Sequence, residues 1–389
     1  MKKIGIITGT RAEYGLLKPV IDKVYHASDL ELQLVATGMH LSPEFGLTYQ
    51  EIEKDGYPIT TKIEMLLSSD TSVGITKSMG LAMISFADYY EVYKPDIVII
   101  LGDRFEMLAA ASAAMIAKVP IAHIHGGELT EGVIDEAIRH SITKMSYLHF
   151  CTTSDYRKRI IQLGEDPQRV YNVGALGVEN IKRLSLLSKS QLEKGINFSL
   201  EGKVLIVTYH PVTLENMSSK EQFENLLEVL SLYKDFRIIF TKANADTNGR
   251  VINQLIDKYT EEHKERCVAF DSMGQLRYLS ALQYCYGVIG NSSSGIIEVP
   301  SFQIPTIDIG DRQRGRVAAQ SVIHCNNDMD SIKDAFRQMM SDNFRKKIRK
   351  CDNPYEGEKT SEKIIEIIKK TLEDGIDIKK KFYDLRVRE

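Results

Sequence analysis

The chain has 389 residues, of which 43% are hydrophobic and 26% charged, with a formal net charge of -3. This length favours two domains over a single core, and the near-neutral charge gives no electrostatic reason to expect nucleic-acid or membrane partners. The five cysteines form no CxxC pair, which argues against a disulfide framework or a cysteine zinc site. Scattered cysteines of this kind favour a reducing cytoplasm, and no apolar run approaches the length of a membrane span.

Strand and helix patterns alternate along the first half of the chain. Helical patterns such as 14–26 and 72–93 carry apolar residues at three- and four-residue spacing. Short apolar runs between them predict strands at 3–8, 32–37, 96–101, 120–124, 148–152 and 170–173. This alternation is typical of an α/β domain with a parallel sheet.

A second series of the same kind follows a glycine-containing interruption at 174–177 and a charged helical stretch at 179–194. It predicts strands at 203–208, 236–241, 267–270, 287–290 and 306–309. We therefore predict two doubly wound domains with a hinge near the interruption. The isoleucines of 361–372 predict a terminal helix that could cover either domain.

The stretch 96–128 is a βαβ unit with polar residues after each strand. Asp103 and Arg104 follow the first strand, and the second leads into His123-Ile124-His125-Gly126-Gly127-Glu128. Because ligands of open parallel sheets bind beyond the carboxyl ends of the strands, we expect the chemistry there. His123, His125 and Glu128 are a weak metal signature, and a structural histidine is the favoured interpretation.

Further acids open the next helical pattern at Asp135 and Glu136. Helix-dipole complementarity could explain these two acids by themselves. Together with Asp103 and Glu128, however, they concentrate carboxylates around one unit, and carboxylates that share a site shift one another's pKa, as general acids and bases require.

Three loops predict anion contacts. Arg11 follows the first strand in Thr8-Gly9-Thr10-Arg11, although a solvent-exposed arginine is the simpler interpretation. Ser292 and Ser293 lie between an apolar strand and a helical pattern, with Glu298 about one turn into that helix; the simpler alternative is a serine N-cap with a first-turn acid. His210 precedes Pro211 at a strand end and is a candidate catalytic acid/base or phosphate ligand, the simpler alternative being a loop histidine without a role.

Seven stretches together resemble one family, the hydrolysing UDP-N-acetylglucosamine 2-epimerases. They are GTRAEYGLLKP from residue 9, GDRFEML from 102, HIHGGE from 123, IDEAIRHSITK from 134, HPVT from 210, GNSSSGIIEV from 290 and RQRGR from 312. They occur in the family's order, and the resemblance runs from the first strand to beyond Arg316, which is most of the chain. Such a set is far more specific than any of its members.

The resemblance implies a fold of the GT-B glycosyltransferase type, with two facing Rossmann-like domains and an active-site cleft between them. The expected N-terminal domain comprises 1–174 and a returning C-terminal segment, 361–389, and the expected UDP-binding domain comprises 175–360. The implied reaction converts UDP-N-acetylglucosamine to N-acetylmannosamine and UDP, by elimination to a 2-acetamidoglucal and addition of water, for sialic acid biosynthesis.

The resemblance also implies roles for individual residues. Asp103, Glu128 and Asp135 match the acid/base carboxylates, with Glu136 an adjacent alternative to Asp135, and His210 matches a histidine near the diphosphate. The positions that match nucleotide contacts are Arg11, Arg104, Asn244, Ser292, Ser293 and Glu298, with Arg312 and Arg316 as weaker candidates. No cofactor or metal is implied, and the expected partners are the UDP-sugar and further copies of the chain, as a dimer or tetramer.

Three alternatives remain open. The same reaction on UDP-2,4-diacetamido-2,4,6-trideoxyglucose (UDP-N,N'-diacetylbacillosamine), for legionaminic acid biosynthesis, shares every motif. A GT-B glycosyltransferase would keep the phosphate contacts but would not need three acids. A binding protein could keep the fold without the chemistry, but the presence of every acid argues against it.

Overall fold

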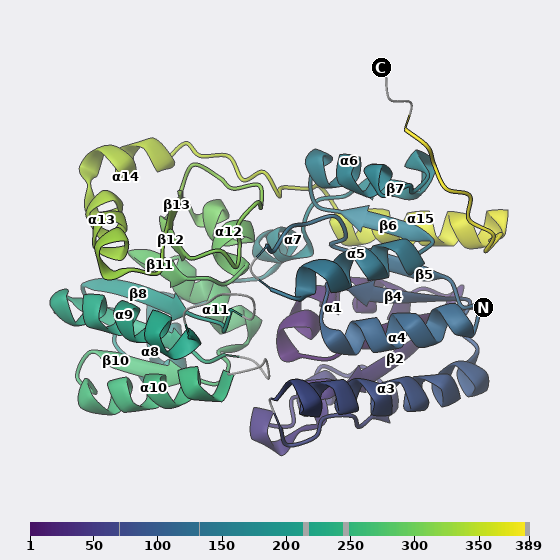
Figure 1. Cartoon of the computed structure of the whole chain (residues 1–389), viewed down its shortest axis with the longest axis horizontal. Coiled ribbons are helices and arrows are strands. Elements are labelled where there is room, and N and C mark those ends of the chain that lie inside the picture. The colour runs from purple at the N-terminus through teal and green to yellow at the C-terminus, as the bar shows by residue number, and fades with distance from the viewer. Residues whose placement is uncertain (70, 132, 213–217, 244–248, 386–389) are drawn as a thin grey trace. The chain divides into compact units, whose positions relative to one another are not determined.

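The computed structural model describes residues 1–69, 71–131, 133–212, 218–243 and 249–385. These form two compact units (Figure 1). The first comprises Met1–Glu128, Asp135–Asn180 and Tyr355–Glu389, and the second Leu129–Ile134 and Ile181–Pro354. The domain bounds expected from the sequence, 1–174 with 361–389 and 175–360, stay predictions. In the described part of the chain no helix is long and apolar enough to span a membrane.

The first unit contains a seven-stranded parallel sheet with the strand order β3-β2-β1-β4-β5-β6-β7. Its strands are β1 (Lys2–Thr8), β2 (Leu30–Thr37), β3 (Ile59–Ile63), β4 (Ile97–Leu101), β5 (Ile121–Ile124), β6 (Leu148–Cys151) and β7 (Val170–Asn172). Its helices are α1 (Arg11–Tyr25), α2 (Tyr49–Lys54), α3 (Ser72–Tyr93), α4 (Phe105–Ile116), α5 (Asp135–Met145), α6 (Ser154–Gln162) and α15 (Thr360–Asp374), while α7 (Leu176–Arg183) continues into the second unit.

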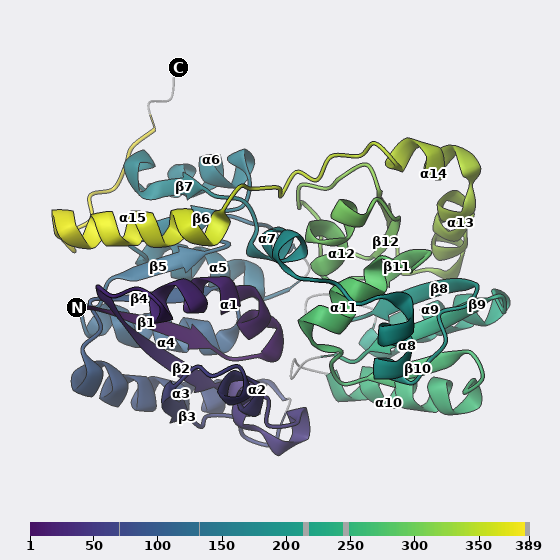
Figure 2. The ribbon, with the colours of Figure 1, turned by 180° about the vertical axis from the view of Figure 1, so that it is seen from behind.

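Helices cover both faces of this sheet, so its central strands are apolar throughout. Every residue of β4 is buried, as expected for a parallel strand between two helical layers. Helices α3, α4 and α5 pack on one face, and α1 and α15 on the other (Figures 1 and 2). Ile364 and Ile368 of α15 share a core with Leu17 and Val20 of α1, so the terminal helix belongs to the first unit.

The second unit contains a six-stranded parallel sheet with the order β10-β9-β8-β11-β12-β13. Its strands are β8 (Lys203–Thr208), β9 (Phe236–Thr241), β10 (Cys267–Phe270), β11 (Gly287–Gly290), β12 (Thr306–Ile309) and β13 (Val322–Cys325). Its helices are α8 (Lys189–Ile196), α9 (Ser219–Leu232), α10 (Gly249–Glu262), α11 (Gly274–Leu282), α12 (Ser294–Ile297), α13 (Met329–Met340) and α14 (Asp342–Ile348).

The α/β class with two Rossmann-like parallel sheets is confirmed, and each predicted strand is present. The single helical stretch predicted at 179–194 is wrong, because α7 ends at Arg183 and α8 begins at Lys189. Ser188 starts the second helix through a capping box with Gln191, whose backbone N–H donates to the serine Oγ. Strands β3 and β13 were not predicted.

Candidate active site

In the first unit, the predicted residues cluster where the strand order reverses. Strands β1 and β4 are neighbours, and the chain leaves them toward opposite faces of the sheet. Arg11 follows β1, whereas Asp103 and Arg104 follow β4. A crevice at this switch point is the usual ligand site of a doubly wound sheet. Glu128 follows β5, the next strand along.

The second unit repeats this arrangement with a different chain segment. Strands β8 and β11 are neighbours at the same position in the strand order. His210 follows β8, and Ser292 and Ser293 follow β11. The switch point of the second sheet therefore carries the residues predicted to contact a diphosphate.

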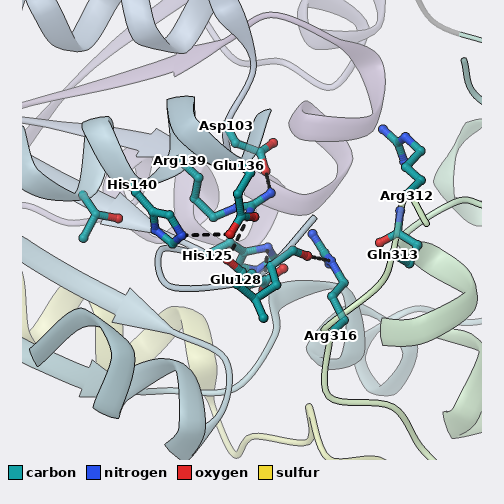
Figure 3. A network of polar contacts seen from close by, with 12 residues as sticks. Asp103, His125, Glu128, Glu136, Arg139, His140, Arg312, Gln313 and Arg316 are labelled. Carbon is teal, nitrogen blue, oxygen red and sulfur yellow. Dashed lines mark hydrogen bonds and ion pairs between the residues drawn. The ribbon is translucent and has the colours of Figure 1, made fainter. Parts of the chain in front are cut away.

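A buried arginine organises the acids of the first unit. Arg139 of α5 is only 1% exposed. Its guanidinium pairs with the Asp103 carboxylate and donates to Glu136 Oε2 at 2.9 Å and to the Glu128 carbonyl oxygen at 2.9 Å (Figure 3). A buried cation is tolerated when carboxylates and further hydrogen bonds replace its water. The guanidinium thus fixes two carboxylates and one loop relative to each other.

The Glu128 carboxylate lies in a tight turn that the sequence HIHGGE makes possible. The Thr152 hydroxyl donates to Glu128 Oε1 at 2.9 Å, and His125 Nδ1 lies 3.9 Å from the same oxygen. The turn has left-handed backbone at His125 (φ 68°) and Gly127 (φ 78°). A Cβ on Gly127 would lie 2.7 Å from the Tyr156 carbonyl oxygen, so only glycine fits.

His123, at the end of β5, is fully buried. Its Nε2 donates to the Gly102 carbonyl oxygen at 2.7 Å, and its Nδ1 lies 3.1 Å from the Thr143 hydroxyl. Complete burial lowers its pKa to about 3, so the ring is neutral. Among the described residues, no group of three or more His, Cys, Asp or Glu could hold a metal ion.

The two adjacent acids at the start of α5 have different surroundings. Glu136 contacts both Arg139 and His140, whose Nε2 lies 3.0 Å from Glu136 Oε1. Asp135 is the first residue of the helix, and both acids are half-buried. Glu136, kept as the alternative at sequence level, therefore joins the network that contains Asp103. The choice between the two acids stays open.

Further acids surround Arg11 and Arg104, the candidate anion contacts of the first unit. Arg104 donates to Glu106 through Nε at 3.2 Å and Nη2 at 3.1 Å, and Arg11 Nε lies 2.7 Å from Glu51 Oε2. Glu13 Oε2 accepts from the backbone N–H of Gly9 at 2.7 Å. Burial, followed by the negative charge of Glu106, raises the pKa of Glu13 to about 8.

This raised pKa predicts a pH dependence of stability. The folded chain holds the Glu13 proton up to about pH 8, whereas the unfolded chain releases it near 4.5. Its contribution is therefore complete below pH 4.5 and is lost as pH rises through 8. We expect the melting temperature of the wild type, relative to Glu13→Gln, to fall between about pH 5 and pH 8.5 in thermal unfolding.

Glu221→Gln provides the matched control. The Ser218 hydroxyl lowers the pKa of the exposed Glu221 carboxylate, so that group stays ionised in both states over this range. Its substitution should leave the pH profile unchanged. A Glu13→Gln profile parallel to the wild type would show that Glu13 does not hold its proton near neutral pH.

In the second unit, Asn291 ties the ends of β8 and β11 together. Its Oδ1 accepts from the His210 backbone N–H at 2.7 Å, and its Nδ2 donates to the His210 carbonyl oxygen at 2.8 Å. The Asn291 carbonyl oxygen in turn accepts from Arg312 Nη1 at 3.1 Å and Gln313 Nε2 at 2.8 Å. One buried amide thereby places His210 beside the serine loop.

Gly290 permits this close approach. Its φ is 138°, and a Cβ there would lie 1.9 Å from the Thr208 carbonyl oxygen. Any side chain would force β8 and β11 apart at the position where His210 and Ser292 emerge. Gly290, the first glycine of the GNSSSG stretch, is therefore required for β8 and β11 to pack this closely.

The helix expected after the serines is much shorter than the sequence suggests. Helix α12 has four residues, so Glu298, expected about one turn into the helix, is its C-cap instead. Pro300, which has no backbone N–H, lies in the short 3₁₀ turn that follows. A four-residue helix adds little dipole, so a phosphate here would depend on serine hydroxyls, backbone N–H groups and cations.

The remaining nucleotide candidates lie in the loop after β12. Arg316 Nε donates to the Leu129 carbonyl oxygen at 2.9 Å, and both residues belong to the second unit (Figure 3). Leu129 directly follows the predicted acid Glu128, so this hydrogen bond ties the arginine loop to the backbone immediately after that acid. Asn244 lies outside the described residues.

Comparisons with known proteins place the chain in a family. The family model described as UDP-N-acetylglucosamine 2-epimerase matches residues 22–369. The chain is 44% identical over 384 residues to the GDP/UDP-N,N'-diacetylbacillosamine 2-epimerase (hydrolyzing) of Campylobacter jejuni, covering 99% of both proteins. The chain belongs to the hydrolysing UDP-N-acetylglucosamine 2-epimerase family. The resemblance seen in the sequence is thus confirmed.

Other relatives of this epimerase carry related names. It is 38% identical to the polysialic acid biosynthesis protein P7 of Escherichia coli, covering 99% of this chain and 98% of that protein. It is 34% identical to the UDP-N,N'-diacetylbacillosamine 2-epimerase (hydrolyzing) of Legionella pneumophila, covering 95% and 96%. The structure of UDP-GlcNAc 2-epimerase from Neisseria meningitidis bound to UDP-GlcNAc superposes with a TM-score of 0.78 at 21% identity, covering 95% and 100%, which confirms the fold.

Sequence reasoning missed two residues that organise the candidate site of this epimerase. Arg139 appeared in the quoted stretch from residue 134 without a role, although its spacing from Asp135 and Glu136 puts all three on neighbouring positions of one helix face. Asn291 lies in the GNSSSG stretch, where the sequence predicted roles for Ser292 and Ser293 but none for the asparagine. Neither side chain is exposed, and each acts by fixing the residues that were predicted.

Proposed function

We propose that this epimerase hydrolyses UDP-2,4-diacetamido-2,4,6-trideoxyglucose (UDP-N,N'-diacetylbacillosamine), inverting carbon 2 of the sugar and releasing UDP. The sugar product would be 2,4-diacetamido-2,4,6-trideoxymannose, a precursor for legionaminic acid. The type of reaction is the one expected from the sequence. The proposed substrate is the one that the sequence analysis gave as an alternative to UDP-N-acetylglucosamine.

The main support is the 44% identity, over 99% of both chains, to the Campylobacter protein named for this substrate. The Legionella relative carries the same substrate name at 34% identity. Identity of this extent over nearly the whole length favours a shared reaction type and a related substrate.

The chemistry requires a positioned base and acid. A carboxylate removes the proton from carbon 2 while the bond from carbon 1 to the diphosphate oxygen breaks, and its electrons leave with UDP. Water then adds its hydroxyl to carbon 1 of the resulting double bond, and a proton returns to carbon 2 on the opposite face. We assign the acid and base roles to Asp103, Glu128 and either Asp135 or Glu136, because Arg139 fixes these segments in one arrangement.

Departure of UDP needs positive charge and hydrogen-bond donors at the phosphates. In the first unit, Arg11 and Arg104 extend from the ends of neighbouring strands and are the proposed cations. In the second unit we assign the diphosphate and ribose contacts to His210, Ser292, Ser293, Glu298 and, more weakly, Arg312 and Arg316. The buried amide of Asn291 supports this assignment, because it holds His210 beside the serine loop.

UDP-N-acetylglucosamine is the second candidate substrate, with N-acetylmannosamine as the product. The description of the matching family model names this sugar nucleotide, and the Escherichia coli relative is named for polysialic acid biosynthesis. The two substrates differ at carbons 4 and 6, away from the reacting carbons. The acid/base assignment is therefore the same for both.

Turnover of the two sugar nucleotides separates these candidates. The purified protein is incubated with each UDP-sugar in deuterated water, and the products are followed by NMR. We expect UDP and a manno-configured sugar with deuterium at carbon 2. We also expect a kcat/KM at least about tenfold higher for the diacetamido substrate, since an apolar group such as its carbon-6 methyl contributes about 1–3 kcal/mol in a pocket that fits it.

Controls in the same experiment cover the other readings. A GDP-linked diacetamido sugar tests whether uridine is required. Faster turnover of UDP-N-acetylglucosamine would replace the proposed substrate with the second candidate. Transfer of the sugar only after an acceptor is added would identify a glycosyltransferase and would overturn the proposed reaction.

A further inference from the structure

Glu106 is a buried acid to which the proposed mechanism gives no role. It is the second residue of α4, and its side chain is 0% exposed. An acid in the first turn of a helix interacts favourably with the helix dipole without having to leave water. A glutamate is almost never buried completely unless a partner compensates its charge. The burial of Glu106 therefore indicates a specific partner.

That partner is the guanidinium of Arg104. Arg104 Nε lies 3.2 Å from both carboxylate oxygens of Glu106, and Arg104 Nη2 lies 3.1 Å from Glu106 Oε1. The Arg104 side chain is itself only 12% exposed. A planar guanidinium that is bound through two of its nitrogens has a preferred orientation, whereas a single contact would let it turn. Glu106 therefore fixes the direction in which the Arg104 guanidinium points.

The loops after β1 and β2 leave room for this carboxylate. Gly9 follows β1, and Gly38, with a φ of 56°, follows β2. A Cβ on Gly38 would lie 3.1 Å from Glu106 Oε1 and 3.0 Å from the Gly9 carbonyl oxygen, in a backbone conformation that favours glycine. A Cβ on Gly9 would lie 3.7 Å from the same Glu106 oxygen. Two glycines thus border the space that the Glu106 carboxylate occupies.

A second buried carboxyl group in this cluster stays uncharged. Glu13 lies against the same loop, since a Cβ on Gly9 would lie 3.3 Å from Glu13 Oε2. Burial and the negative charge of Glu106 raise the pKa of Glu13 to about 8, so Glu13 holds its proton at neutral pH. The ring of His40, whose backbone N–H donates to the Gly9 carbonyl oxygen, is neutral as well, because burial lowers its pKa to about 4. Of the two acids, Glu106 is therefore the one whose charge acts on Arg104.

We propose that Glu106 is a positioning residue for the nucleotide, whose buried carboxylate holds the Arg104 guanidinium in the orientation that contacts the diphosphate of the UDP-sugar. This role rests on the proposed function, which assigns Arg104 to the phosphates. A side chain that is 0% exposed acts on the ligand only through Arg104. A guanidinium that is already oriented loses less freedom when the ligand binds, which strengthens binding.

Removal of the Glu106 charge separates orientation of Arg104 from simple neutralisation. Glu106→Gln keeps the size of the side chain but withdraws a negative charge from beside the guanidinium. If Glu106 only neutralised Arg104, the variant would present more positive charge to the phosphates and would bind UDP more tightly. Because Glu106 orients the guanidinium, we expect the variant to bind UDP at least about tenfold more weakly in calorimetry at neutral pH.

Two further variants show whether the effect passes through Arg104. Arg104→Met should itself weaken UDP binding. In that background, Glu106→Gln should change the UDP dissociation constant by less than about twofold, because no guanidinium is left to orient. Glu106→Asp keeps the charge but draws both oxygens back by one methylene, so it should also weaken UDP binding. Glu106→Asp leaves the buried guanidinium with an anion, so it tests the role even if Glu106→Gln does not fold.

Glu13→Gln is the matched control, because Glu13 belongs to the same cluster but is already uncharged. Its glutamine can still accept from the Gly9 backbone N–H, as Glu13 does at 2.7 Å, and UDP affinity should be unchanged. Thermal unfolding checks that each variant is folded.

The outcomes distinguish this role from the proposed function. Weaker UDP binding in Arg104→Met, with wild-type or tighter binding in Glu106→Gln and Glu106→Asp, would overturn the positioning role and leave the proposed function intact. An undiminished effect of Glu106→Gln in the Arg104→Met background would also overturn the positioning role alone. Wild-type UDP affinity in Arg104→Met would overturn both the positioning role and the assignment of Arg104 to the phosphates.

Discussion

Asp103→Asn is expected to reduce turnover by roughly 10²- to 10⁴-fold, the usual contribution of a positioned acid or base. Asparagine keeps the shape of the side chain, and its Oδ1 can still accept from Arg139. Glu136 remains to neutralise that guanidinium, at 2.9 Å from Arg139 Nη1. The variant should therefore fold, and it should bind UDP as the wild type does.

Two measurements on each protein decide the assignment: the rate of UDP release and UDP affinity by calorimetry. Asp96→Asn is the matched control, because Asp96 immediately precedes β4, at the opposite end of that strand from Asp103, where it accepts from the Lys3 backbone N–H at 2.7 Å. That variant should keep full turnover. Ser293→Ala should show the reverse of Asp103→Asn, with weaker UDP binding and smaller loss of chemistry. Weakened UDP binding with preserved chemistry in Asp103→Asn would rule it out as the acid or base.

All strands in the interior of the two sheets were predicted, because helices cover both faces of such a strand and favour apolar residues along it. The edge strands β7 and β10 were predicted as well. The two strands that were missed, β3 and β13, lie at the edges of their sheets. Strand β3 reads Ile-Thr-Thr-Lys-Ile, with only Ile63 buried, and β13 contains the exposed His324. An apolar run that polar residues interrupt, such as Thr60, Thr61 and Lys62 in β3 or His324 in β13, stands out less from a loop.

The residues of the candidate site also fall into those that the sequence could predict and those that it could not. Acids and cations that follow a buried strand were predictable, since the strand pattern itself marks where its carboxyl end lies. Arg139 and Asn291 were not, because their roles come from three-dimensional contacts with other chain segments. The short α12 was readable in principle: Pro300 lies six residues after Ser294 and limits the helix. The three serines predict where the helix begins, whereas Pro300 is the residue that predicts its early end.

Arg139→Met is expected to lower both stability and turnover, because one guanidinium serves three chain segments. Its loss leaves Asp103 and Glu136 as neighbouring carboxylates without their shared cation, and the Glu128 carbonyl oxygen without its donor. Removing one partner from a buried ion pair costs about 3–5 kcal/mol. Arg139→Lys keeps the charge but lacks the wide planar fork with which the guanidinium reaches its separate acceptors. That variant should fold, with turnover reduced roughly 10- to 100-fold through misplaced acids.

Arg266→Met is the control that separates a loss of stability from a loss of turnover. Arg266 is also buried, but it donates to neutral oxygens, Tyr259 Oη at 2.7 Å and the Phe236 carbonyl at 3.2 Å, in the second unit away from the predicted residues. Its substitution should lower the melting temperature without changing kcat. If Arg139→Lys turned over as fast as the wild type, and Arg139→Met lost only stability, Arg139 would be a structural cation. A fall in kcat for Arg139→Lys at preserved melting temperature would instead show that the acids must be held in register for the proton transfers at carbon 2.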